Sequence, residues 1–283
     1  MVRAPASTAN LGPGFDCAGA ALELWNELHV EEGTTGIDIE GEGAGELPRD
    51  EHHLALRAFA LFATPAGRHF RFVNRIPLER GLGSSASAIA LGLVAGAAVA
   101  GESLTPGELL EAGEPLEGHG DNLAAALHGG VCLAWRRDGR IVARRIADDL
   151  PAVPIVAVPA ARTNTEGSRA ALPPTVSHAD AAANSASAAL LGAAVATGDV
   201  ALLRDAFNDY LHEPYRRTEL LDRLRANPPA GTIGVTLSGS GPSVVVWAEP
   251  EHAGSVATEL VRTLPEHTTV LPLRVAQTGA GLT

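Results

Sequence analysis

Two glycines and two serines stand directly before a long uncharged stretch, an arrangement that could bind phosphate. Gly81, Gly83, Ser84 and Ser85 lead into a run of small and apolar residues without a charged side chain. Glycines before a helix let its unpaired N–H groups approach an anion closely, and serine hydroxyls are common metal ligands beside phosphates. The segment therefore predicts a phosphate-binding loop. A flexible Gly/Ser connector is the alternative, but connectors do not usually lead straight into a long uncharged helix.

The basic residues of the chain limit how such a loop can work. All 21 of them are arginine, so no lysine is present for a Walker A loop, a protein-kinase strand or a Schiff base. Backbone amides and the helix dipole would hold the phosphates instead. The formal net charge of −12 argues against a nucleic-acid partner, because phosphate backbones select basic surfaces.

A second candidate site lies in the segment LEGHGDN, residues 116–122. Glu117, His119 and Asp121 occupy alternate positions there, and carboxylates together with hydroxyls suit Mg²⁺ beside a nucleotide. The simpler interpretation makes Asp121 the cap of a helix that starts near Leu123, which is common for aspartate. His119 alone is more often structural than catalytic.

The pattern of apolar and turn residues predicts the elements that position these groups. Alternation predicts strands at residues 1–6, 23–32 and 69–77, another within 35–45, and a hairpin over 131–146 around an Asp-Gly turn. Helical spacing predicts helices at residues 52–63, after the glycine loop, from Thr105 onward with Pro106 in first position, and over 121–130.

Prolines and a new apolar strand at residues 148–159 indicate a domain boundary near residue 150. The length of 283 residues allows two domains of ordinary size, so we expect domains at 1–150 and 151–283. Helices are predicted at residues 178–196 and 199–211, and strands within 232–248 and 268–276 flank a further helix.

Features of the whole chain favour a cytoplasmic protein without a membrane partner. Its start has no apolar leader, and the run at 85–100 is short and rich in small residues, which favours a buried helix. The two cysteines, Cys17 and Cys132, give no disulfide framework.

Three segments in order resemble the GHMP kinases, and within them the homoserine kinase family. PLERGLGSSAS at residues 77–87 resembles the second superfamily motif, and TLSGSGPSVVVWA at 236–248 resembles the third. PASTANLGPGFDCAGAAL at residues 5–22 is similar to the first motif of the homoserine kinases. The resemblance implies an α+β fold with an ATP-binding N-terminal domain of the ribosomal protein S5 domain 2-like type. It also implies a ferredoxin-like α/β C-terminal domain, with the site in the cleft between the two.

The resemblance further implies an activity, two cofactors and a metal site. ATP would phosphorylate the side-chain hydroxyl of L-homoserine to give O-phospho-L-homoserine for threonine biosynthesis. Glu117 would bind Mg²⁺ together with Ser85, and relatives are often homodimers. The residues implied to hold ATP are Pro77, Leu78, Glu79, Arg80, Gly81, Leu82, Gly83, Ser84, Ser85, Ala86 and Ser87.

The same family pattern implies a substrate site for a zwitterionic amino acid. Such a substrate needs a carboxylate for its ammonium group, which Asp16 offers, and arginines for its carboxylate, which Arg169 and Arg216 offer. Asn10, Asp16 and Arg169 are expected nearest the reacting groups. The complete set implied for homoserine is Asn10, Asp16, Asp121, Asn122, Thr165, Arg169, Arg216 and Gly239. Any single arginine here could also be a solvated surface charge, and the glycines around Gly239 could form a simple turn.

Two points of mechanism stay open at this stage. A loose phosphoryl-transfer transition state needs positioning more than proton removal, which favours a reaction without a dedicated base, but Asp16 could instead be a true base. The chain also departs from the family: His53 stands where Asn is usual near the adenine pocket, and Gly120 and Ala125 stand where prolines are frequent. A GHMP kinase for another small alcohol, or a nucleotide-binding sensor without transferase activity, are the alternative functions.

Overall fold

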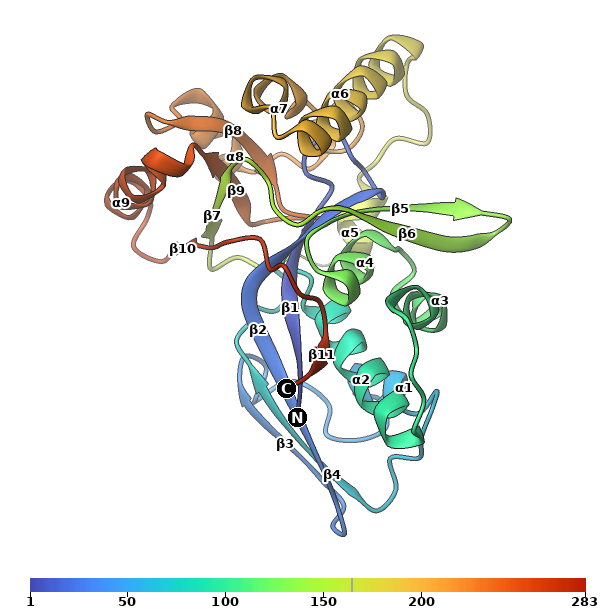
Figure 1. Ribbon diagram of the computed structural model, residues 1–283. Coiled ribbons are helices and arrows are strands. Elements are labelled where there is room, and N and C mark those ends of the chain that lie inside the picture. The colour runs from blue at the N-terminus through green and yellow to red at the C-terminus, as the bar shows by residue number, and fades with distance from the viewer. Residues whose placement is uncertain (164) are drawn as a thin grey trace.

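The computed structural model describes residues 1–163 and 165–283, and the side chains of Thr165 and Glu166 are not part of that description. In these residues the strands form two sheets, one of seven strands and one of four (Figure 1). The fold is α+β, as the sequence predicts.

The first sheet contains the N-terminal strands in the order β11-β1-β2-β4-β3. A hairpin of β5 and β6 extends it, because β5 pairs with the beginning of β2. β3 and β4 run parallel and are connected through α1, whereas the other pairs are antiparallel. The strands are β1 (Val2–Ala9), β2 (Ala18–Glu32), β3 (Gly36–Gly41), β4 (Arg68–Asn74), β5 (Val131–Arg137), β6 (Arg140–Ala147) and β11 (Gly281–Leu282).

Four helices cover one face of this sheet (Figure 1). They are α1 (Leu54–Phe59), α2 (Ser84–Ala100), α3 (Pro106–Glu117) and α4 (Asp121–His128). α2 is the predicted uncharged helix, and its side chains at Ile89, Leu91 and Leu93 are fully buried in the core against the sheet. Glycine at position 92 allows α2 to pack closely on α1, because a Cβ there would lie 2.0 Å from the carbonyl oxygen of Ala55. No helix in the described part of the chain combines the length and hydropathy that crossing a bilayer requires.

The second sheet is antiparallel, with the order β10-β7-β9-β8. This order and the succession of elements are those of a ferredoxin-like domain, as predicted. Helices α8 and α9 pack on one face of the sheet, and α6 and α7 pack with the first sheet on the other. The elements are β7 (Val153–Val158), α5 (Thr165–Ala170), α6 (His178–Thr197), α7 (Val200–Ala206), η1 (Glu213–Tyr215), α8 (Glu219–Ala226), β8 (Thr232–Leu237), β9 (Val244–Ala248), η2 (Pro250–His252), α9 (Ala253–Thr263) and β10 (Thr269–Pro272).

The two sheets share a core. Leu11 and Leu22 from the N-terminal segment join Val156, Val245 and Trp247 of the second sheet in one buried cluster. After β10 the chain returns to the first sheet, where β11 pairs with β1 and places the C-terminus beside the N-terminus (Figure 1). The apposed halves hold the loops at their junction in fixed positions. The boundary near residue 150 stays a prediction.

Several elements of the structure differ from the predicted ones. The first strand continues three residues beyond position 6, to Ala9. The helix predicted at 199–211 stops at Ala206, because the carboxylate of Asp209 accepts the backbone N–H groups of His212 and Glu213 at 2.8 and 2.7 Å and forms a turn. α8, which Thr218 caps, was not among the predicted elements.

Candidate functional site

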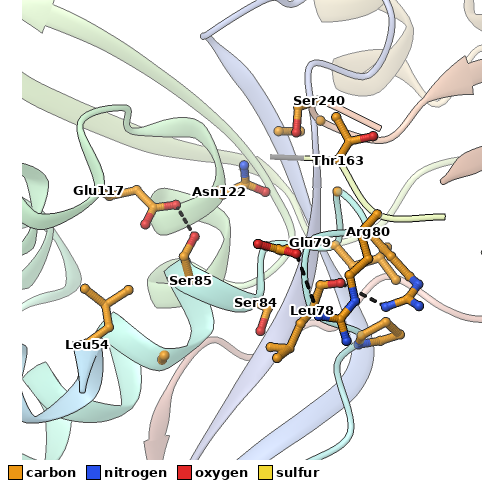
Figure 2. Close-up of a pocket in the computed structure, with 18 of the residues that line it drawn as sticks. Leu54, Leu78, Glu79, Arg80, Ser84, Ser85, Glu117, Asn122, Thr163 and Ser240 are labelled. Atoms are coloured by element: carbon orange, nitrogen blue, oxygen red, sulfur yellow. Dashed lines mark hydrogen bonds and ion pairs between the residues drawn. The ribbon is translucent and has the colours of Figure 1, made fainter. Parts of the chain in front are cut away.

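A cavity of about 510 Å³ lies where the glycine loop meets the two sheets. Its lining contains the residues predicted for the site, with three exceptions described below (Figure 2). Ala86 and Ser87 point away from it, since both are fully buried and the hydroxyl of Ser87 donates to the carbonyl of Ala4 at 3.3 Å. Thr165 begins α5, but its side chain falls outside the described part of the chain.

The glycine loop is held by close contacts that only glycine permits. Gly81 and Gly83 have φ angles of 73° and 64°, in the left-handed region. A Cβ on Gly81 would lie 2.1 Å from the carbonyl oxygen of Ser238, and the hydroxyl of Ser238 donates to the carbonyl of Gly81 at 2.6 Å. α2 begins directly after Gly83, and none of the described side chains caps its first turn. The first N–H groups of a long helix are therefore available to an anion in the cavity.

Arg80 belongs to this loop but uses its guanidinium to fasten it. It donates to the carbonyls of Leu78, Pro159 and Ala160, each at 3.0 Å. Figure 2 shows Arg80 beside Leu78. The backbone N–H of Thr163 donates to the carbonyl of Glu79 at 2.9 Å. The positive charge of Arg80 thus ties the loop to the end of β7.

A buried carboxylate faces the start of α2. Glu117 ends α3, its side chain is only 4% exposed, and its Oε1 accepts the hydroxyl proton of Ser85 at 2.9 Å (Figure 2). Burial raises the pKa of this carboxyl, while His119 and Ser85 act in the opposite direction. Nδ1 of His119 lies 4.0 Å from Oε1 of Glu117. Two hard oxygens at the edge of a phosphate loop, one from a poorly compensated buried carboxylate, fit a divalent cation such as Mg²⁺.

The next residues of the cluster enter the first turn of α4. Asp121 is buried, and its Oδ1 lies 3.2 Å from Nδ1 of His119, which raises the pKa of that histidine. Asn122 accepts the hydroxyl proton of Ser7 at 2.8 Å. The N-cap of α4 is Gly120, so the interpretation of Asp121 as a helix cap was wrong.

The turn after β1 brings Asn10 and Asp16 together. Both have left-handed φ angles, 71° and 54°, which Asn and Asp adopt more readily than most residues. The side-chain amide of Asn10 accepts the backbone N–H of Asp16 at 3.1 Å and donates to the carbonyl of Gly239 at 3.0 Å. Asn10 therefore joins the turn to the loop of the second sheet and fixes the backbone of Asp16.

Asp16 and Arg169 form a two-pronged ion pair across the cavity. Nη1 and Nη2 of Arg169 lie 2.8 Å from the two carboxylate oxygens of Asp16, and this contact raises the pKa of the guanidinium. Arg216 lies beside them, 8% exposed, with its Nε donating to the carbonyl of Ser168 at 3.2 Å. Burial, and then the charge of Arg169, lower the pKa of Arg216.

Phe15 supports both arginines, and the sequence analysis did not find it. The guanidinium carbons of Arg169 and Arg216 lie 5.6 and 5.3 Å from the centre of its ring, within the range of a cation–π contact. The ring also stacks on His212 at 5.1 Å, whose Nε2 is 3.0 Å from the carbonyl oxygen of Gly12. The GFD sequence around Phe15 gives no chemical signal for this function.

The opposite end of the cavity is apolar. Leu54, Phe72 and Leu91 line it together with His53, whose ring stacks on Phe72 at 4.3 Å. Nδ1 of His53 accepts the backbone N–H of Ala55 and caps α1. Burial lowers the pKa of His53 to about 4, so the ring is neutral at pH 7. A neutral, apolar lining suits an aromatic base.

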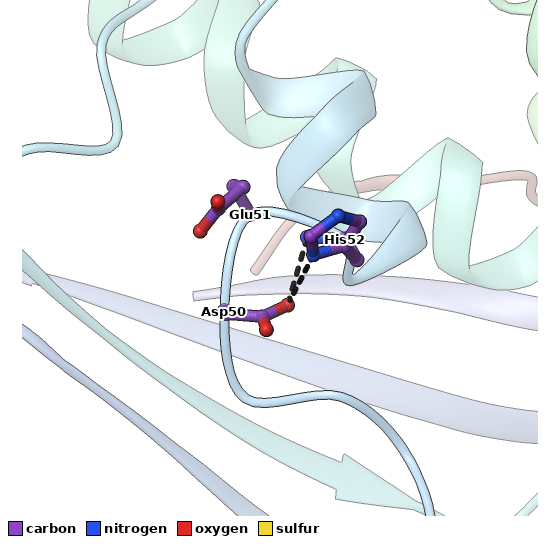
Figure 3. Close-up of side chains that lie close together, drawn as sticks. All are labelled: Asp50, Glu51 and His52. Atoms are coloured by element: carbon purple, nitrogen blue, oxygen red, sulfur yellow. Dashed lines mark hydrogen bonds and ion pairs between the residues drawn. The ribbon is translucent and has the colours of Figure 1, made fainter.

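A group of possible metal ligands beside the apolar end of the cavity, of which His52 is part of the lining, has a structural explanation. Asp50, Glu51 and His52 lie close together and are all exposed (Figure 3). Oδ1 of Asp50 accepts the backbone N–H of His52 at 2.9 Å and contacts Nδ1 of its ring at 3.1 Å. These bonds order the turn before α1.

Comparison with known proteins gives one consistent family. A model of the "GHMP kinases N terminal domain" matches residues 53–130. Homoserine kinase of Moorella thermoacetica is 42% identical over 256 residues, covering 87% of this chain and 86% of the relative. The enzyme of Streptomyces coelicolor is 44% identical over 271 residues, covering 90% and 86%. The crystal structure of homoserine kinase from Cytophaga hutchinsonii matches with a TM-score of 0.86 and 25% identity, covering 100% and 96% of the two chains.

Proposed function

Because the chain belongs to the homoserine kinase family of the GHMP kinases, we propose that its cavity transfers the γ-phosphoryl group of ATP to the hydroxyl of L-homoserine. The observation that carries the proposal is the composition of this one cavity. It joins a helix N-terminus behind a glycine loop, a buried carboxylate beside it, and a pair of arginines with a facing aspartate.

The nucleotide would lie with its base at the apolar end and its phosphates at the glycine loop. Leu54 and Phe72 make the lining at that end apolar, which suits a base, and the N–H groups around Ser84 offer hydrogen bonds to phosphate oxygens. These donors are fixed before the nucleotide binds, so they lose little freedom when it does. Lysine is not needed in this arrangement.

Ser85 and Glu117 would hold a magnesium ion. Their oxygens are already 2.9 Å apart, and a magnesium ion would supply positive charge to a buried carboxylate whose pKa burial raises. When bound, Mg²⁺ would supply positive charge that neutralises the phosphates during transfer.

Homoserine would occupy the charged end of the cavity. Asp16 can accept its ammonium group, and Arg169 and Arg216 can donate to its carboxylate. Asn10 holds the backbone of Asp16 through a hydrogen bond, and Asp121 lines the same cavity as the phosphate loop. These groups aim the hydroxyl at the γ-phosphorus, and positioning of this kind supplies most of the catalysis for a loose transition state.

An ADP-release assay with a panel of alcohols tests this function. Homoserine, mevalonate and galactose are each supplied with ATP and Mg²⁺, and we expect only homoserine to stimulate ADP release. Stimulation by another alcohol alone would assign a different GHMP kinase activity. Binding of ATP with no stimulation by any alcohol would identify a nucleotide-binding sensor. The Arg169→Ala variant should raise the KM for homoserine, and an unchanged KM would remove Arg169 from the substrate site.

Location in the cytoplasm and a homodimeric state remain predictions. Gel filtration with light scattering measures the second directly, and a monomer mass would contradict it.

A further inference from the structure

We propose that a second cavity, lined by α1 and its neighbours, binds a small monocarboxylate with an apolar body. Its volume is about 520 Å³, within the range of roughly 300–1,000 Å³ that is typical of small-molecule sites. Among the described residues, none lines both this second cavity and the candidate active site. The proposal goes beyond the proposed kinase function and does not depend on it.

The apolar part of the lining brings together segments that are distant in the sequence. Phe70 of β4 and Leu56 of α1 are buried side chains of the first core, and both line the second cavity. Half-buried side chains add to this surface, namely Ile37 of β3, Pro65 in the loop before β4, and Leu116 of α3. A hydrocarbon or aromatic group placed against these side chains leaves water, which favours a ligand with an apolar body.

Two arginines of the lining carry charges that no described carboxylate pairs with. Arg57 is exposed on α1 and has no hydrogen bond or ion pair with any described residue. Arg49 donates to the carbonyls of Ile37 and Ala44 at 3.3 and 2.7 Å, and these neutral acceptors leave its charge in place. In a chain with a formal net charge of −12, such a group of arginines is a local exception that attracts an anion.

A third arginine is paired only at the surface. Arg68 donates to the carbonyl of Thr64 at 2.6 Å and to Oε1 of Glu32 at 3.2 Å. The side chain of Glu32 is 81% exposed, so water screens this ion pair and makes it weak. Arg68 itself is only 16% exposed and lines the cavity, where its positive charge adds to those of Arg49 and Arg57.

The charge balance of the lining selects a singly charged ligand. Besides the three arginines, the lining contains two carboxylates, Asp50 and Glu51, on the turn before α1 (Figure 3). One net positive charge remains. A monocarboxylate neutralises it, whereas a phosphate ester, with a charge of about −1.5 to −2 at pH 7, would exceed it. A carboxylate also matches the planar fork of a guanidinium group.

4-Phenylbutyrate tests the site, because it joins one carboxylate to an apolar body whose ring shifts the NMR signals of nearby methyl groups. It is titrated into the full-length protein with labelled isoleucine δ1-methyl groups. Among the described residues, Ile37 is the one isoleucine that lines the second cavity, and no isoleucine lines the candidate active site. We expect a saturable shift of the Ile37 signal and none at Ile155, which is buried in the core of the second sheet.

Two analogues separate the contributions of charge and apolar contact. 4-Phenylbutyramide has nearly the same shape without the charge, and acetate has the charge without the apolar body. Each should bind about tenfold more weakly than 4-phenylbutyrate, because one loses a charge-assisted hydrogen bond and the other loses apolar burial.

Three substitutions at exposed positions assign the charge effect without disturbing the core. Arg57→Gln should weaken 4-phenylbutyrate binding about tenfold and leave the amide unchanged, because only the carboxylate uses the guanidinium charge. Glu51→Gln should strengthen 4-phenylbutyrate binding about threefold, since it removes a like charge from the lining. Arg262→Gln, at an exposed position of α9 outside both linings, is the matched control and should change neither affinity.

The absence of a saturable shift at Ile37 would overturn the proposal, and so would equal shifts at Ile37 and Ile155. Equal affinities for the acid and the amide would show that the arginines do not select the ligand, which contradicts the proposed class. The same conclusion follows if Arg57→Gln binds 4-phenylbutyrate as tightly as Arg262→Gln does. None of these outcomes bears on the kinase assignment, which the ADP-release assay tests separately.

Discussion

The nucleotide half and the substrate half of the cavity offer different groups to a charged ligand. The nucleotide half consists of the glycine loop with Ser84 and Ser85 and the apolar wall with His53, and it offers backbone amides and neutral side chains. The substrate half consists of Asp16, Arg169 and Arg216, with Phe15 packed against the two arginines, and Asp16 and Arg169 are bonded to each other in the free protein.

This difference indicates which half can change its side-chain contacts when a ligand binds. Gly81 accepts a hydrogen bond from Ser238 in the loop between β8 and β9, and backbone atoms of that loop leave no room for a Cβ at position 81. Arg169 is held by a side chain that a ligand can replace. Substitutions in the nucleotide half should therefore reduce activity through geometry, and those in the substrate half should alter selectivity and affinity.

The largest effect is expected at Gly81, where the nucleotide half is least adaptable. Gly81→Ala places a methyl group 2.1 Å from the carbonyl oxygen of Ser238, which no change of rotamer can relieve. The loop has to shift, and a displacement of about 1 Å costs on the order of 100-fold in rate. Steady-state kcat/KM for ATP measures the loss.

Gly198→Ala is the matched control for the backbone strain. Gly198 ends α6 with a φ of 70°, close to the 73° of Gly81, but no atom lies within 4 Å of an added Cβ. It should cost about 1 kcal/mol of stability from the left-handed backbone and leave kcat/KM unchanged. Equal losses of activity in the two variants would contradict the idea of a fixed loop.

An effect of similar size is expected at Glu117, where the two halves meet. Glu117→Gln keeps the shape and the hydrogen bond from Ser85 but removes the charge that a magnesium ion requires. We expect turnover to fall on the order of 100-fold and to recover in part at high Mg²⁺. Glu111→Gln, on an exposed face of the same helix, is the control. Near-normal turnover of Glu117→Gln at low Mg²⁺ would exclude Glu117 as the ligand.

Much of the site could be predicted because its chemistry leaves a local signature. Glycines with adjacent serines and an uncharged helix predict an anion site from physical principles alone, and the structure places that loop on the cavity. Asp16 and Arg169 became candidates through the family motifs, because a single charged residue carries no such signature. Family motifs added the roles that spacing alone left open.

The remainder depends on contacts between distant segments. Phe15 has no sequence signature, because its function depends on the two guanidinium groups of Arg169 and Arg216 that pack on its ring. Asp16 and Arg169 are 153 positions apart, so their pairing follows from the apposition of the sheets. Arg80 belongs to the phosphate motif, but its guanidinium donates its hydrogen bonds to three backbone carbonyls from two segments of the chain. For α8, the Thr218 cap and the spacing of Leu221 and Leu224 were present in the sequence and were overlooked.

A pH-dependent effect is expected from the neutral histidine of the nucleotide half. The folded-state pKa of His53 is about 4, below its ordinary value of 6.5, so on acidification the unfolded chain takes up a proton before the folded protein does. Stability is therefore lost as the pH falls from 6.5 towards 4. At pH 5 the loss is on the order of 2 kcal/mol, from about 1.36 kcal/mol per pH unit.

His53→Asn tests this directly because asparagine also caps helices and does not titrate. Urea unfolding at pH 7 and pH 5 should show a smaller loss of stability for the variant than for wild type. Parallel losses in the two proteins would mean that His53 is protonated in the folded state.

The smallest effect is expected at Phe15, and it tests whether the substrate half depends on an uncharged support. Phe15→Leu keeps an apolar side chain but removes the aromatic face from Arg169 and Arg216. A cation–π contact contributes about 0.5–2 kcal/mol, so the KM for homoserine should rise about fivefold. The KM for ATP and kcat should change by less than about twofold, because the ring packs on Arg169, Arg216 and His212.

Trp135→Leu is the corresponding control, since Arg137 lies 5.7 Å from that ring in the exposed β5–β6 hairpin. It should leave both KM values unchanged. If Phe15→Leu raises the KM for ATP as much as that for homoserine, the ring supports the junction of the two sheets as a whole. The division of the cavity into a rigid half and an exchangeable half would then be wrong at this position, because one side chain would control both.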